Sequence, residues 1–180
     1  FQVRDVDKLS TEDKNDFHST VASILYMAKR ARPDLLTAVS FLTRRVIAPD
    51  IDDKKKLNRA LKYLNATKEY ALVIRPSDGI QVHAWVDASY AVHADYRSHT
   101  GVAIGIGGGA TYAKSTVQKL NTKSSTESEI VGVSDASGHI IWTKDFLTFQ
   151  GYDLGPAILY QDNQSSMALI NKGYSTSDKS

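Results

Sequence analysis

Three acidic side chains in the second half of the chain have the type and the setting to bind metal ions. Asp87 ends the strand-like run "IQVHAWVDA", Asp162 ends the run "AILYQD", and Glu129 lies in the phrase "STESEI" at the start of a helical stretch. Strand ends are where open α/β sheets bind ligands, and carboxylate oxygens suit Mg²⁺ or Mn²⁺ better than zinc. Two such ions about 4 Å apart clamp the attacking and leaving oxygens of a phosphodiester. The alternative interpretation is three unrelated surface or capping acids.

Two glutamates compete for the helical position in this set. In a helix that begins near Ser125, Glu127 and Glu129 lie roughly 200° apart, so they cannot share one face. Glu129 lies about 60° from the centre of the apolar stripe and Glu127 about 100°. That stripe consists of Ile130, Val131, Val133, Ala136, Ile140 and Ile141. We therefore expect Glu129 to face the sheet, and Glu127 to complement the helix dipole in the first turn.

The second half of the chain has the strand period that a sheet requires. Apolar residues at 80, 82, 84 and 86 alternate with Gln81, His83, Trp85 and Asp87, as in a half-buried strand. Further strand-like runs are "YALVI", "TGVAIGI", "ATYAKS" and "AILYQD", and the glycine cluster "GGG" reads as a hairpin turn. Helices are expected from about Ser125, over "HIIWTKDFLTFQ" and over "QSSMALINK". This order predicts an α/β fold with a mixed sheet.

The first half of the chain reads as helical. Phe17, Val21, Ile24, Leu25 and Ala28 form one apolar face. A second helix is expected from Pro33 to about Ile47, and a third after "APDIDD", capped by Asp52 or Asp53. The third helix carries a basic stripe, which is either a solvated face or a phosphate-contacting surface: Lys54, Lys55, Lys56, Arg59 and Lys62.

Composition and charge indicate two parts with different roles. Residues 1–75 carry 15 Lys and Arg against 10 Asp and Glu, a net charge of +5, whereas residues 76–180 carry 7 against 10, a net charge of −3. We therefore predict two domains, residues 1–75 and residues 76–180. The absence of cysteine excludes disulfides and thiol catalysis and favours an intracellular location. Because the chain opens on Phe1 without a signal peptide, we expect a fragment of a longer protein.

Longer phrases give a resemblance to a known family. The runs "VDASYAVHADYRSHTG", "KSTVQKLNTKSSTESEIVGVSDA" and "ILYQDNQSSMALINKG" resemble the ribonuclease H domain of copia-type retrotransposon Pol polyproteins. The metal-binding acids of that family fall on Asp87, Glu129 and Asp162, and the family's "DADWA" phrase appears here as "DASYA", with Ser89 in place of the second acid. Residues 1–75 resemble the helical thumb and connection segment of the same family's reverse transcriptase. The likeness covers roughly residues 14–180.

The resemblance implies a fold and an activity. The fold is a ribonuclease H-like mixed sheet of five strands flanked by helices, preceded by the mostly helical segment. The activity is hydrolysis of the RNA strand of RNA/DNA hybrids by water that two Mg²⁺ or Mn²⁺ ions activate, leaving a 5′-phosphate and a 3′-hydroxyl. The partners are the hybrid, read by its shape and 2′-hydroxyls, and the remaining polyprotein domains, with no membrane. An intracellular location follows, in cytoplasmic virus-like particles or in the nucleus.

Two departures from the family leave an alternative open. The paired aspartates of the polymerase are absent. The family's last motif, with a further polar ligand, is expected just beyond Ser180, and Asp178 belongs by phrase to the preceding loop. The alternative function is a catalytically incomplete fragment that binds nucleic acid or a partner polypeptide. An integrase-type nuclease is disfavoured, because its acids run Asp, Asp, Glu along the chain.

Other polar and aromatic residues have weaker assignments. Candidates for nucleic-acid contact, or alternatively for loop and helix capping, are Arg97, Ser98, Asn163, Gln164 and Ser165. Structural or surface roles are expected for His83, His93, His99 and His139, which share no metal-ligand spacing. Both tryptophans, Trp85 and Trp142, are expected in the core.

Overall fold

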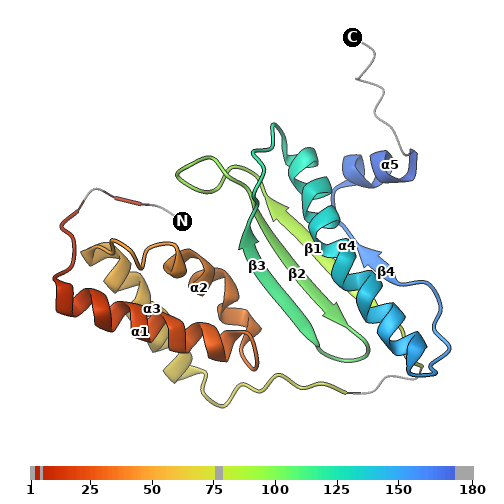
Figure 1. The fold of residues 1–180 in the computed structure, drawn as a ribbon, viewed down its shortest axis with the longest axis horizontal. Coiled ribbons are helices and arrows are strands. Elements are labelled where there is room, and N and C mark those ends of the chain that lie inside the picture. The colour runs from red at the N-terminus through yellow and green to blue at the C-terminus, as the bar shows by residue number, and fades with distance from the viewer. Residues whose placement is uncertain (1–2, 5, 76–78, 173–180) are drawn as a thin grey trace, which may run out of the picture. The chain divides into compact units, whose positions relative to one another are not determined.

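The computed structural model describes residues 3–4, 6–75 and 79–172. The chain divides into two compact units, Phe1–Leu72 with Lys114–Thr116, and Val73–Ala113 with Val117–Ser180. Figure 1 shows helices in the N-terminal part of the chain and a sheet with two helices in the C-terminal part. Each unit has its own set of buried apolar residues.

The first unit contains α1 (Thr11–Ala28), a 3₁₀ turn (Pro33–Leu35), α2 (Leu36–Thr43) and α3 (Ile51–Ala66). Ser10 caps α1 by accepting a hydrogen bond from the Asp13 amide at 3.2 Å. The buried residues of α1 are Phe17, Val21, Ile24 and Ala28, which confirms four of the five predicted positions, and Leu25 is half-buried. The second helix ends at Thr43 rather than near Ile47, because residues 44–48 tighten into turns with bonds from Arg45 to Leu42 and from Ala48 to Arg45.

The cap of α3 differs from the prediction. Asp50, not Asp52 or Asp53, is the N-cap, and its carboxylate accepts from the Asp53 amide at 2.8 Å. Asp53 returns the contact by accepting from the Asp50 amide at 3.1 Å, which completes a capping box. Arg45 joins both carboxylates, at 2.8 Å to Asp53 and 3.0 Å to Asp50.

The second unit contains most of a four-stranded mixed sheet in the order β3-β2-β1-β4, in which Lys114–Thr116 of β3 are grouped with the first unit. The strands are β1 (His83–Ser89), β2 (His99–Gly105), β3 (Tyr112–Val117) and β4 (Ile158–Tyr160). β1 pairs antiparallel with β2 and parallel with β4. The mixed α/β class predicted from the sequence is confirmed.

The expected fifth strand is not formed in the described residues. The run "YALVI" at 70–74 is not a strand, and a single bridge joins Arg75 to Gly108 beside it. Tyr70, Val73 and Ile74 are exposed, so this run has no buried face to hold it in register. The C-terminal end of the run lies against the backbone of Gly108 and Gly109, but its side chains are mostly exposed, and exposed side chains stabilise a strand only weakly.

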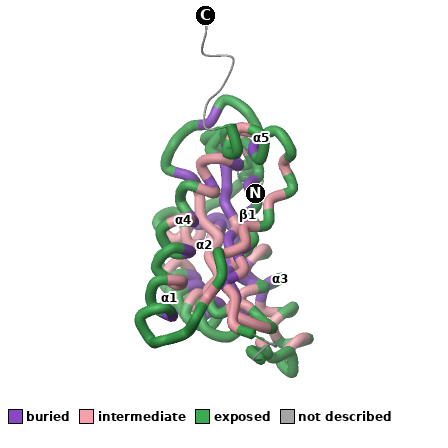
Figure 2. Tube along the Cα trace, turned by 90° about the vertical axis from the view of Figure 1, so that its right-hand side faces the viewer, coloured by how far each residue is buried: buried purple, intermediate pink, exposed green. Residues whose placement is uncertain are grey.

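A single long helix covers one face of the sheet (Figure 1). The two predicted helical stretches are one helix, α4 (Ser125–Phe149), and it is followed by β4 and by α5 (Gln164–Lys172). The core between α4 and the sheet contains Val82, Ala84, Val86, Val102, Ile104, Ala136, Ile140 and Leu147. Both buried and exposed residues lie along α4 (Figure 2), and the buried ones recur mostly at helical spacing. Ile141, predicted in its apolar stripe, is 59% exposed. None of the described helices has the length and apolar character that a membrane crossing requires.

Candidate metal centre

The pairing of β1 with β4 brings the two aspartates to the same sheet edge. Asp87 lies on β1, two residues before its end. The parallel register pairs Trp85 with Tyr160, the last residue of β4. Asp87 and Asp162 each follow that pair by two residues. Their carboxylates therefore lie at the same height along the direction of the parallel strands.

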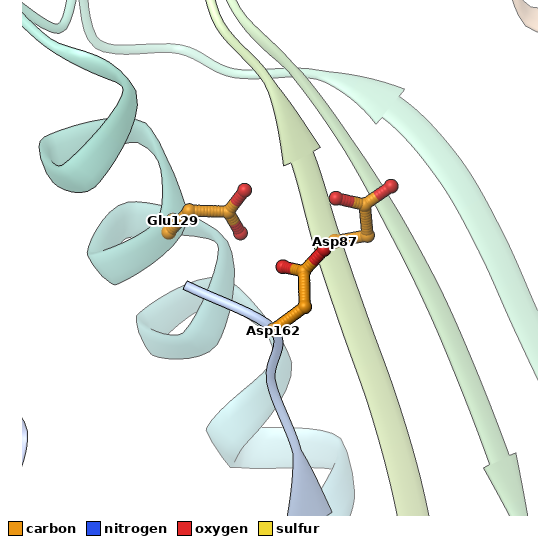
Figure 3. A group of neighbouring side chains, drawn as sticks. All are labelled: Asp87, Glu129 and Asp162. Atoms are coloured by element: carbon orange, nitrogen blue, oxygen red, sulfur yellow. The ribbon is translucent and has the colours of Figure 1, made fainter. Parts of the chain in front are cut away.

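The start of α4 supplies the third acid. Ser124 caps the helix by accepting from the Glu127 amide at 3.1 Å, and the exposed Glu127 carboxylate accepts from the Lys123 amide at 2.6 Å. Glu127 therefore serves the helix start, as predicted. Glu129 points toward the aspartates (Figure 3) and is only 5% exposed.

The three predicted ligands come together. One carboxylate oxygen from each of Asp87, Glu129 and Asp162 lies within 4.8 Å of the others, with both aspartates exposed and the glutamate buried. Three carboxylates from a strand, a helix and a loop form an all-oxygen donor set. Such a set fits a hard divalent cation.

Electrostatics at Glu129 favour a bound cation. Burial raises the pKa of Glu129 above its ordinary value, and the neighbouring charges of Asp87 and Asp162 raise it further. Hydrogen bonds from the Gln161 side chain and from the Ala88 backbone act in the opposite direction on that pKa. A divalent cation among the carboxylates would remove the repulsion and hold Glu129 ionised.

One polar contact at this site was not predicted from the sequence. The Gln161 side chain donates to the Glu129 carboxylate at 3.0 Å and accepts from the Asn163 amide at 3.0 Å. The sequence offers one hint, which is that Gln161 directly precedes Asp162. Its partner is 32 residues away along the chain, and only the fold brings the two together.

The candidates for nucleic-acid contact separate into two groups. Ser98 is fully buried, and its hydroxyl bonds to Thr122 at 2.8 Å and accepts from the Ala91 amide at 3.1 Å, which favours a structural role. Asn163 caps α5 by accepting from the Ser166 amide at 2.9 Å. Arg97, Gln164 and Ser165 are exposed, and Arg97 forms an ion pair with Asp95 at 3.6 Å.

The four histidines of the second unit each form a hydrogen bond with another ring side chain. His93 and His99 are buried and bond to each other at 2.9 Å. His139 bonds to Tyr112 at 3.0 Å, and His83 bonds to Tyr160 at 3.1 Å. Within the described ranges, the acidic trio is the one group of three or more possible ligands.

The expectation of core tryptophans was wrong. Trp85 is 45% exposed and Trp142 is 64% exposed. Trp85 lies on the face of β1 opposite the buried Ala84 and Val86, which pack against α4. There it stacks with Tyr160, with ring centroids 5.1 Å apart.

The basic stripe of α3 is partly neutralised within its own unit. Lys54 pairs with Asp13 at 2.6 Å, Lys55 with Asp52 at 3.9 Å and Lys56 with Asp53 at 3.9 Å. These pairs favour the solvated-face interpretation, and phosphate contact stays a prediction.

Comparisons with known proteins agree with the family suggested by the motifs. The chain is 32% identical over 153 residues to the retrovirus-related Pol polyprotein from transposon RE2 of Arabidopsis thaliana, a match that covers 84% of the chain and 10% of the relative. It is 31% identical over 157 residues to that from transposon TNT 1-94 of Nicotiana tabacum, which covers 87% of the chain and 12% of the relative.

A shorter relative matches over most of its own length. The secreted RxLR effector protein 161 of Plasmopara viticola is 30% identical over 125 residues, which is 69% of this chain and 88% of the effector. No protein-family profile and no solved structure matches the chain. The chain spans about a tenth of the length of the polyproteins it matches, and on these similarities it belongs to the copia-type retrotransposon Pol polyproteins.

Proposed function

We propose that residues 76–180 are a ribonuclease H domain of a copia-type reverse transcriptase and that residues 1–75 are its thumb and connection segment. The domain would hydrolyse the RNA strand of RNA/DNA hybrids during reverse transcription. One observation carries the proposal: carboxylates in the chain order Asp, Glu, Asp, from β1, α4 and the loop after β4, lie within 4.8 Å of one another.

The residues present would hold two Mg²⁺ or Mn²⁺ ions. When bound, such ions lower the pKa of an attacking water and neutralise charge on a phosphodiester. Asp87 and Asp162 are exposed while Glu129 is buried, so a phosphate group would approach from the aspartate side. Glu129 would then bind the ions from the buried side of the site, held in position by the helix α4.

Recognition of the hybrid would use polar groups near the exposed aspartates. Gln164 and Ser165 are the first two residues of α5, and Asn163 separates them from Asp162. A helix N-terminus together with polar side chains suits sugar–phosphate contact. Arg97, exposed in the loop that follows β1, is a third candidate. Such contacts read shape and 2′-hydroxyls rather than base sequence.

The test is cleavage of an end-labelled RNA/DNA hybrid in Mg²⁺ and in Mn²⁺. Asp162→Asn should lower the rate by more than about 100-fold, because loss of a direct ligand exceeds the 10–100-fold typical of an outer-shell partner. Asp145→Asn makes the same chemical change at an exposed position of α4, 16 residues along the chain from Glu129, and should cleave normally. Cleavage that survives Asp162→Asn would refute the proposal. Hybrid binding without cleavage by the unmodified chain would instead identify it as a binding module.

A further inference from the structure

We propose that Gln161 is a positioning residue that sets the Glu129 carboxylate relative to Asp162 for metal binding. The inference rests on the proposed metal centre and assigns a role to a side chain that is not itself a ligand. The evidence is geometric, because the Gln161 side-chain amide contacts both the Glu129 carboxylate and the backbone of the loop that carries Asp162.

The two contacts of Gln161 have different partners. Its Nε2 donates to Glu129 Oε2 at 3.0 Å, which joins the loop after β4 to α4. Its Oε1 accepts from the Asn163 amide at 3.0 Å, which closes a turn around Asp162. Asp162 is thus the central residue of a turn whose first residue also holds Glu129.

The chemistry of the partners fixes the orientation of the amide. A backbone N–H can only donate, so the oxygen of Gln161 must face Asn163. The nitrogen must then face Glu129, whose carboxylate accepts. To make both contacts, a side chain must be as long as glutamine and must carry a donor and an acceptor on one rigid group. Methionine has no donor and only a weak acceptor, its sulfur, and asparagine is one methylene shorter.

The short strand β4 explains why Asp162 needs hydrogen bonds from Gln161 to hold its loop in position. β4 has only three residues and pairs with β1 over those three, so the strand ladder ends before Asp162. Beyond the ladder, Gln161 bonds to Asn163, and Asn163 in turn accepts from the Ser166 amide at 2.9 Å. A continuous chain of hydrogen bonds therefore links Glu129 on α4 to the first turn of α5, with Asp162 between them. Partners of this kind orient ligands and tune metal affinity.

The experiment measures Mn²⁺ binding by isothermal titration calorimetry on the full chain. Gln161→Met, which keeps the side-chain length and removes the amide, should weaken Mn²⁺ binding by about 10- to 100-fold. Gln150→Met removes the same group from the exposed end of α4 and should bind Mn²⁺ as the unmodified chain does. Circular dichroism checks that each variant is folded. If Gln161→Met does not fold, Gln161→Asn gives the same test, because it keeps the amide and loses the reach to Glu129.

The outcomes separate this inference from the function on which it rests. Unchanged Mn²⁺ affinity in a folded Gln161 variant overturns the positioning role and leaves the metal centre intact. Absence of Mn²⁺ binding by the unmodified chain overturns both. Weakened binding in the Gln161 variant with normal binding by Gln150→Met supports the inference, since a purely structural role would change the melting temperature without a selective change in metal affinity.

Discussion

Glu129 is an acid in an unfavourable place. It is buried beside two other carboxylates, and burial and their charges raise its pKa above the ordinary value of 4.5. A group kept at such a cost to the free energy of folding is typical of a functional site. Its neighbour Glu127 is exposed and accepts a hydrogen bond from the Lys123 backbone amide at 2.6 Å.

Replacing Glu129 should therefore stabilise the metal-free protein. The folded state binds the Glu129 proton more tightly than the unfolded state does, so stability falls as pH rises from 4.5 through the raised pKa. Without divalent ions, Glu129→Gln should raise the melting temperature at pH 7 and leave it unchanged at pH 4. Differential scanning calorimetry measures both. A lower melting temperature at pH 7 would contradict the prediction.

A control for this effect lies two residues away. Glu127→Gln makes the same change on the exposed side of the helix start, where it removes a charge that complements the helix dipole and should lower stability by about 0.3–1 kcal/mol. The two variants together separate the burial of Glu129 from a general effect of removing one negative charge.

At the scale of elements, the approach of α4 to the sheet depends on a glycine. A Cβ at Gly132 would lie 3.2 Å from Thr100 Cγ2 and 3.4 Å from Val86 Cγ1, whereas a Cβ at Gly138 would meet nothing within 4 Å. Gly132 lies three residues after Glu129, so the same close approach sets the depth of the carboxylate.

The two glycines should respond oppositely to substitution. Gly132→Val should lower the free energy of unfolding by about 1–3 kcal/mol through overpacking and should weaken Mn²⁺ binding, because α4 must move outward. Gly138→Ala should raise stability by roughly 0.5–1 kcal/mol, since alanine favours the helix interior. Urea unfolding followed by tryptophan fluorescence tests both. Tight Mn²⁺ binding by Gly132→Val would show that the helix position does not control the site.

The capping box of α3 is the corresponding feature of the first unit. Burial alone would raise the pKa of Asp50, but the Asp53 amide, Arg45 and Lys8 outweigh it and hold that pKa below 3.8. A lowered pKa means that this stabilisation is present above pH 3.8 and is lost as pH falls through the folded-state value.

Breaking the box should destabilise the first unit. Asp53→Ala removes the acceptor of the Asp50 amide and the closest partner of Arg45. The expected loss is roughly 2–3 kcal/mol, below the 3–5 kcal/mol of a fully buried pair because Arg45 is partly exposed. Far-UV circular dichroism in urea measures it, with Asp16→Ala on the exposed face of α1 as the control. An Asp53→Ala variant as stable as that control would contradict this account.

At the scale of the whole molecule, the two units have separate cores and one of them holds the candidate centre. Both tryptophans of the chain, Trp85 and Trp142, belong to the second unit. Tryptophan fluorescence therefore reports on the unit with the carboxylates, while circular dichroism also reports on the helices of the first unit.

Metal ions should stabilise the second unit selectively. Mn²⁺ at about 100 times its dissociation constant should add about 2.7 kcal/mol to the unfolding free energy of the state that binds it. The urea midpoint seen by fluorescence should rise, and the part of the circular dichroism transition due to the first unit should not. Equal shifts by both probes would show that the units unfold as one.

The sequence by itself determined part of the local structure and which three acids come together. Side-chain periodicity depends on backbone geometry alone, so the stripe of α1, the alternation along β1 and the choice of Glu129 over Glu127 follow without tertiary information. The tertiary structure decided what depends on contacts between distant residues. Alternation places Trp85 and Asp87 on one face of β1, but which face α4 covers is a packing outcome, and so Trp85 is exposed. The run at 70–74 has strand composition, but in the folded protein its side chains are mostly exposed, so it does not become a strand. Gln161 reaches Glu129, 32 positions away along the chain, because β4 pairs with β1 and α4 packs against β1.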